Sequence, residues 1–175
     1  MLSRSHARDL ERLVRPMTPG AQNMFADLPA WQAMLDRYQE LFSDMLPGSR
    51  IGILPRSGTS LMPGKHLAGL SSSGFSLPEG KMLAWEVSVA TGMRASYRPC
   101  RNFHDAQADL LLVPDDAALE EIRRTLAADP LSTIKKMIRC GSILFFVMKS
   151  KYQLQDAGYE DFLDTLGLAF MGACR

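Results

Sequence analysis

Residues 82–98 read MLAWEVSVATGMRASYR, and this stretch has the clearest strand pattern in the chain. Apolar residues alternate with small or polar ones on both sides of Thr91-Gly92, which is the period of a half-buried strand. The apolar positions are Leu83, Trp85, Val87 and Val89 before that pair and Met93, Ala95 and Tyr97 after it. Because Thr91-Gly92 can turn the chain, the stretch predicts a β-hairpin.

Further apolar runs on both sides of the hairpin extend the predicted sheet. Strands are expected at 50–54, 109–113 and 143–148. The last run is apolar on both faces, which is typical of a central strand. Between the first strand and the hairpin, residues 55–80 are rich in Gly, Ser and Pro and predict a long irregular loop.

Amphipathic spacing predicts helices before and after the strands. Two N-terminal helices are expected at 3–15 and 28–46, a third opened by Asp115-Asp116, a short one from Ser132, and a last one after Gly158. Helices and strands do not alternate strictly along the chain. We therefore expect a single α+β domain over 1–175, with a mostly antiparallel or mixed sheet of four to five strands covered by helices.

The composition is that of a folded, soluble protein. The chain has 175 residues, of which 46% are hydrophobic and 22% charged. No apolar segment follows the early arginines, and the longest apolar run, 143–148, is far shorter than the roughly 20 residues that span a bilayer. We expect a cytosolic protein without membrane contact, in which three scattered cysteines stay reduced. Arginine outnumbers lysine 14 to 6, a bias that we associate with GC-rich bacterial genomes.

Charge is sorted into blocks although the formal net charge is only +1. Residues 47–104 and 131–153 each sum to +5, whereas residues 105–130 sum to −5. Such blocks can leave a small fold with a basic face and an acidic face, which bears on its partners more than on its folding. The complementary blocks also allow self-association.

Seven basic residues make up the candidate binding surface. Two share a strand face turned away from the core, three share a helix face, and two follow the last strand: Arg94 and Arg98; Lys135, Lys136 and Arg139; Lys149 and Lys151. If the three groups are adjacent in space, they form a patch that suits phosphates, a nucleic-acid backbone or an acidic protein surface. The sequence pI of about 7.7 is low for a dedicated nucleic-acid binder, so we favour a protein partner.

The segment from Gly58 to His66 resembles a phosphate-binding loop but fails its spacing. Five residues instead of four separate Gly58 from Gly64, Pro63 removes a backbone donor, and a histidine replaces the hydroxyl residue after Lys65. A weaker hypothesis keeps an anion-binding loop, whose candidates are Arg56, Lys65 and His66.

Cys100 and His104 are the weak catalytic candidates. They could act as a nucleophile and its base, or as part of a zinc site, but a structural zinc needs four ligands and no second close pair exists. We favour the simpler interpretation of a small buried or half-buried cysteine and a surface histidine. If the thiol is exposed, Arg98 and Arg101 would lower its pKa.

Three functions follow from these residues, and no cofactor or metal is expected. The leading hypothesis is a small cytosolic bacterial accessory or adaptor protein that binds a protein partner through its charged faces. The alternative is a small enzyme, or an essential enzyme subunit, whose site combines loop 56–66 with segment 100–105. The third is a nucleic-acid-binding accessory protein, for which we expect no complex tighter than micromolar because the acidic block 105–130 repels a polyanion.

Overall fold

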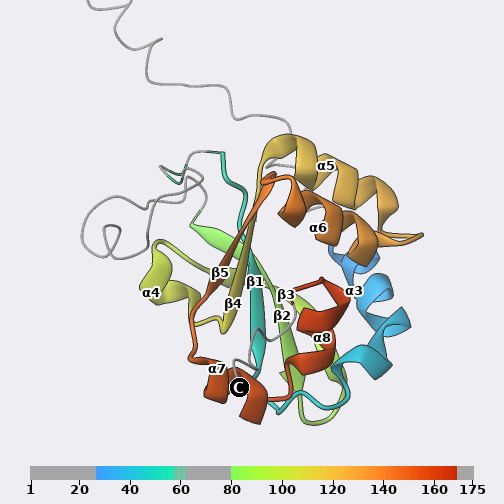
Figure 1. Ribbon diagram of the computed structural model, residues 1–175, viewed down its shortest axis with the longest axis vertical. Helices are drawn as coiled ribbons and strands as arrows, with labels where there is room; N and C mark the ends of the chain where they lie inside the picture. Colours follow the sequence, from blue (N-terminus) through green and yellow to red (C-terminus); the bar gives the residue numbers. More distant parts are fainter. Residues whose placement is uncertain (1–26, 58, 60, 62–79, 169–175) are drawn as a thin grey trace, which may run out of the picture.

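The computed structural model describes residues 27–57, 59, 61 and 80–168, which contain a five-stranded sheet (Figure 1). The strands are β1 (Arg50–Ile53), β2 (Lys81–Ser88), β3 (Gly92–Pro99), β4 (Leu110–Pro114) and β5 (Ile143–Val147). Their order is β3-β2-β1-β4-β5. The β1 and β4 strands are parallel, and every other neighbouring pair is antiparallel. The sheet is mixed, and the expected α+β class is confirmed.

The hairpin predicted from residues 82–98 is present as β2 and β3. The two strands pair antiparallel, with Trp85 opposite Ala95 and Ser88 opposite Gly92. Gly92 has a φ of +70°, a backbone conformation that glycine adopts without steric cost, and this allows the chain to reverse directly before β3.

Helices and one 3-10 turn connect and cover these strands. The described ones are α3 (Leu28–Arg37), η2 (Gln39–Phe42), α4 (Phe103–Ala106), α5 (Asp116–Thr125), α6 (Pro130–Arg139), α7 (Lys151–Asp156) and α8 (Glu160–Thr165). None of them is long and apolar enough to cross a bilayer. The helix predicted at 3–15 lies outside the described residues.

Two helix predictions need correction, and a further helix with a clear start signal was not predicted. The helix expected at 28–46 ends at Arg37, because Tyr38 leaves helical geometry and a 3-10 turn continues the same buried face. The α6 helix begins at Pro130 instead of Ser132, since Asp129 caps it by accepting a hydrogen bond from the Ser132 N–H. The α7 helix was not predicted, although Ser150 and Gln153 form the capping box that marks its start.

The prediction that 143–148 is the central strand is wrong. The sheet order places β5 at one edge and β1 in the centre. The run is apolar on both faces because each face packs on a different cluster: Ile143 and Phe145 on one, Leu144 and Phe146 on the other. Burial on two faces therefore does not require a strand on each side. Val147, near the end of this edge strand, is 47% exposed.

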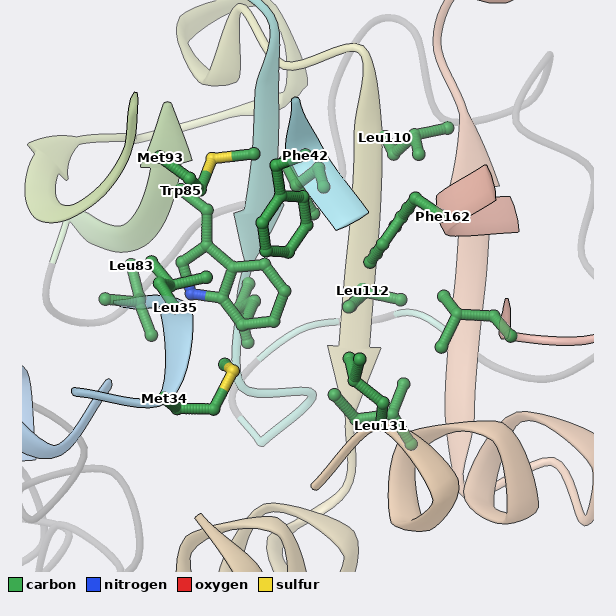
Figure 2. Close-up of a cluster of buried hydrophobic side chains, with 14 of the residues drawn as sticks. Met34, Leu35, Phe42, Leu83, Trp85, Met93, Leu110, Leu112, Leu131 and Phe162 are labelled. Carbon is green, nitrogen blue, oxygen red and sulfur yellow. The ribbon is translucent and has the colours of Figure 1, made fainter. Parts of the chain in front are cut away.

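The main core lies between the sheet and the helices that cover one of its faces (Figure 2). Trp31 of α3 and Trp85 of β2 are fully buried, with ring centroids 5.8 Å apart. Phe42 of η2 and Phe162 of α8 pack beside them at a similar centroid distance of 5.8 Å. A second cluster, which includes Leu54, Met82, Cys100 and Leu111, lies on the opposite face.

The outer edge of β3 is covered by a side chain of α3. The Gln32 Oε1 atom accepts a hydrogen bond from Ala95 N–H at 2.9 Å, and its amide donates to Met93 C=O at 3.3 Å. The amide thus pairs with backbone groups of β3 as a neighbouring strand would, which protects this edge from pairing with another chain.

Candidate binding surface on helix α6

The basic residues of α6 project outward because its other face is fixed in the core. Leu131 and Ile134 are buried in the main core. The helical period therefore turns Lys136 and Arg139 toward solvent, with Lys135 half-buried between the two faces. A shallow hollow of about 370 Å³, here called the basic hollow, is lined by Ser132, Lys135, Lys136, Arg139 and Cys140.

The C-terminal end of α8 lies against two of these side chains. A Cβ atom on Gly167 would lie 2.9 Å from Lys135 Cε and 3.0 Å from a guanidinium nitrogen of Arg139. The absence of a side chain at Gly167 therefore lets both basic side chains pack over the backbone there. Two elements, α6 and the residues after α8, hold the hollow in place.

The three cations of the basic hollow have no ion-pair partner within 4.0 Å in the described part of the chain. Six of the eleven other basic residues that the structure describes have one: Arg50 and Arg98 with Glu86; Arg56 with Asp115; Arg123 with Asp27 and Glu120; Arg124 with Glu121; Lys149 with Asp109. A hydrogen bond from Arg124 lowers the pKa of Glu121, and Lys136 contributes to this shift electrostatically. The hollow is therefore a place where positive charge is left without a bonded counter-charge.

The sheet order divides the seven predicted binding residues into three groups. Arg94 and Arg98 lie on β3. The β3 and β5 strands are the two edges of the sheet, and the other three strands lie between these edges. The Lys149 side chain follows β5 and lies 3.9 Å from Asp109. Lys151 begins α7. The structure therefore brings together Lys135, Lys136 and Arg139 but does not join them to the other two groups.

Arg98 is further tied to the sheet by Glu86. The Glu86 carboxylate lies 3.1 Å from Arg50 Nε and 2.5 Å from a guanidinium nitrogen of Arg98. Burial acts to raise the pKa of Glu86, but the hydrogen bonds and charges of the two arginines outweigh it and lower that pKa. Of the two predicted β3 residues, only Arg94 is exposed without an ion pair among the described residues.

The described residues among the anion-binding and catalytic candidates are engaged or buried in ways that do not favour anion binding or catalysis. Arg56 pairs with Asp115 at 2.8 Å, whereas Lys65, His66 and the side chain of His104 lie outside what the structure describes. Cys100 is fully buried, and this burial, helped by the Asp105 charge, raises its pKa to about 11. The thiol is therefore protonated at neutral pH.

The two segments of the enzyme hypothesis nevertheless meet. Leu61 packs in the same apolar cluster as Cys100 and Ala106. Their contact is apolar, and among the described residues no group of three or more His, Cys, Asp or Glu side chains could hold a metal ion.

The chain matches no protein-family model, no curated protein and no solved structure.

Sequence reasoning missed Cys140 as a neighbour of the basic residues. Its thiol is exposed at the basic hollow, and its Sγ lies 3.5 Å from Ser142 Oγ. A hydrogen bond from this hydroxyl stabilises the thiolate and lowers the pKa of Cys140. The sequence did carry a signal for this contact, because Cys140 directly follows Arg139 and lies within five residues of Lys135 and Lys136.

We expect Cys140 to react with an anionic aromatic disulfide at neutral pH, while Cys100 stays unreactive until the protein unfolds. A lowered pKa gives Cys140 more thiolate at lower pH, and the nearby cations attract the reagent. The experiment uses the Cys174→Ser variant with and without Cys140→Ser, so that the reactions of Cys140 and Cys100 can be told apart. The absorbance of the aromatic thiolate released from the reagent gives the reaction rate at each pH. Equal rates for Cys100 and Cys140 in the folded protein would contradict the assignment.

Proposed function

We propose that this protein is a small cytosolic accessory or adaptor protein that uses the basic hollow to bind an acidic segment of a partner protein. The observation that carries this proposal is that three neighbouring cations line one hollow and have no ion pair among the described residues. An acidic partner would supply the missing counter-charges.

The geometry favours an extended acidic segment over a large folded surface. The hollow is shallow and follows little more than two turns of one helix, from Ser132 to Cys140. Lys135, Lys136 and Arg139 are spaced so that successive carboxylates of a peptide can each meet one cation. The Ser132 hydroxyl adds a hydrogen-bond donor at the other end of this row.

The test replaces Lys135, Lys136 and Arg139 with Gln and measures binding of a fluorescein-labelled oligoglutamate peptide by anisotropy. Three exposed charge pairs of about 0.5 kcal/mol each correspond to a loss of affinity of about tenfold. Added salt should weaken the wild-type complex and have less effect on the variant, because screening acts on the same contacts.

The chain offers a matched control for this experiment. Lys81, Arg94 and Arg101 are exposed and lie elsewhere on the fold, so their triple Gln variant changes the net charge by the same amount. This control should bind the peptide within about twofold of wild type, since a surface charge change away from the contact has little effect. Equal losses in both variants would show that net charge alone drives binding and would refute a site on α6.

Single-stranded DNA of similar length serves as the competing ligand. If it binds more tightly than the acidic peptide at physiological salt, the partner is a nucleic acid and the proposal is wrong. The peptide and the DNA are both anions, so a surface that selects phosphates would bind the DNA far more tightly than the peptide. The two anisotropy curves compare these affinities directly.

A further inference from the structure

A second hollow, here called the sheet-end hollow, lies where β1 and β4 begin and β5 ends. It has a volume of about 330 Å³, and three segments line it: residues 46–49 before β1, Asp109 before β4, and residues within 149–157 after β5. Because β1 and β4 are parallel and β5 is antiparallel to β4, these segments meet at one end of the sheet. The basic hollow precedes β5 and the sheet-end hollow follows it, so the two lie at opposite ends of this strand (Figure 1).

Backbone hydrogen bonds hold the walls of the sheet-end hollow in place. The Leu46 N–H donates to Ala157 C=O at 3.1 Å, which joins the segment before β1 to the end of α7. The Gly48 N–H donates to Val87 C=O at 2.9 Å and fixes the same segment to β2. Ser49 lines the hollow although it is only 5% exposed, so it forms part of the floor. The fold itself therefore forms this hollow before any ligand is bound, as is usual for small-molecule sites.

The Asp109 carboxylate presents one oxygen to this hollow. Its Oδ2 accepts hydrogen bonds from the Tyr159 hydroxyl and Arg50 N–H. Its Oδ1 accepts none from a described residue, and the Lys149 Nζ lies 3.9 Å from it, beyond hydrogen-bond distance. The Asp109 side chain is 15% exposed and the Lys149 side chain 48%, and both line the hollow. A negative and a positive group therefore lie side by side where a ligand can reach both.

The spacing of these two groups suits a ligand that carries both charges close together. A close ion pair has a nitrogen–oxygen distance of about 2.8 Å, so Asp109 and Lys149 are only loosely paired and each can gain a better partner. The amino nitrogen of an α-amino acid is about 3 Å from its carboxylate oxygens, because only one carbon separates the two groups. An ammonium beside Asp109 and a carboxylate beside Lys149 then form a ring of four alternating charges. An amino acid with a longer spacer between its charges does not match this ring.

Apolar surface lies in the same hollow as these charges. Leu46 is 54% exposed, and it lines the hollow together with Pro47 and Ala157. An aliphatic side chain that packs on Leu46 removes apolar surface of both molecules from water, which is favourable. The volume of about 330 Å³ is at the lower end of the range for small-ligand pockets and fits a molecule of this size.

We propose that the sheet-end hollow binds an α-amino acid with an aliphatic side chain. The Asp109 Oδ1 atom accepts hydrogen bonds from the ligand ammonium, Lys149 donates to the ligand carboxylate, and the ligand side chain packs on Leu46. This site is independent of the adaptor function proposed for the basic hollow.

The experiment titrates the isotope-labelled full chain with L-leucine and follows the backbone NMR signals. Two analogues serve as comparisons: L-leucinamide, which lacks the carboxylate, and 4-methylpentanoate, which lacks the ammonium. We expect leucine to shift the signals of residues 46–49 and 149–157 saturably. It should bind about tenfold more tightly than either analogue, because each analogue lacks one of the two charged contacts.

Two variants remove the charges of the site one at a time. Lys149→Met should weaken leucine binding about tenfold, while leucinamide, which has no carboxylate, should bind at least as well as to wild type. Asp109→Asn keeps an oxygen for the Tyr159 and Arg50 donors, and it should weaken leucine and leucinamide but not 4-methylpentanoate. Lys81→Met is the matched control, because Lys81 is exposed at the other end of β2 from the hollow, and it should bind leucine as wild type does.

The outcomes separate this proposal from chance binding and from the basic hollow. The absence of a saturable shift in wild type, or an equal loss of leucine and leucinamide in Lys149→Met, would overturn it. The Lys149→Met comparison decides alone if Asp109→Asn does not fold, since Lys149 is a surface residue. The Gln variant of Lys135, Lys136 and Arg139 should bind leucine unchanged even where it loses the acidic peptide. Loss of leucine in that variant would also overturn the proposal, because the carboxylate would then bind in the basic hollow.

Discussion

Gly158→Ala is expected to destabilise the protein by about 4 kcal/mol or more, or to prevent folding. Gly158 has a φ of +77°, a left-handed conformation that costs other residues about 1–3 kcal/mol. A Cβ atom there would also lie 2.0 Å from the backbone oxygen of Asp44. Because the obstacle is backbone and not a flexible side chain, the α7–α8 turn cannot relax without moving away from the segment after η2.

A matched glycine separates the clash from the backbone conformation. Gly141 has a similar φ of +80°, but nothing lies within 4 Å of the position that its Cβ would take. We expect Gly141→Ala to cost only about 1 kcal/mol, the conformational part of the effect. Urea unfolding followed by tryptophan fluorescence measures both variants. Similar losses would show that the close approach of Gly158 to Asp44 contributes little to the fold.

Asp109→Ala is expected to destabilise the protein by about 3–5 kcal/mol. One carboxylate oxygen of Asp109 accepts two hydrogen bonds, from the Tyr159 hydroxyl at 2.7 Å and from Arg50 N–H at 2.9 Å. The Tyr159 side chain is fully buried, and burial together with the bond to Asp109 raises its pKa. Removal of the carboxylate leaves two donors without an acceptor at the amino ends of β1 and β4.

A double-mutant cycle assigns this loss to the contact itself. Tyr159→Phe removes one donor but leaves no unpaired polar atom on the ring, so it should cost only about 1–2 kcal/mol. In the Asp109→Ala background the same substitution should cost much less, because the bond is already lost. Asp164→Ala, at an exposed carboxylate on α8, is the control and should stay within about 0.5 kcal/mol of wild type. Additive effects of Asp109→Ala and Tyr159→Phe would rule out the proposed coupling.

Local features of this fold could be predicted from the sequence because they depend on residues close together in the chain. The alternation in 82–98 predicts the β2–β3 hairpin, and Asp115 predicts the start of α5, where its side chain accepts the Ala118 N–H. The shared face of Lys135, Lys136 and Arg139 follows from helical spacing in the same way. A periodic pattern does not show where a helix is interrupted, and the break at Tyr38 was therefore missed.

The tertiary structure alone decided which distant segments meet. The apolar run 143–148 has the same pattern in a central strand and in an edge strand packed on two clusters, so only the sheet order places it at the edge. The same order places Arg94 and Arg98 at the sheet edge opposite β5. Asp109 and Tyr159 are 50 positions apart, and nothing in either local pattern indicates their bond. Periodicity determines the face on which a side chain lies, whereas pairing between distant segments depends on the packing of the whole chain.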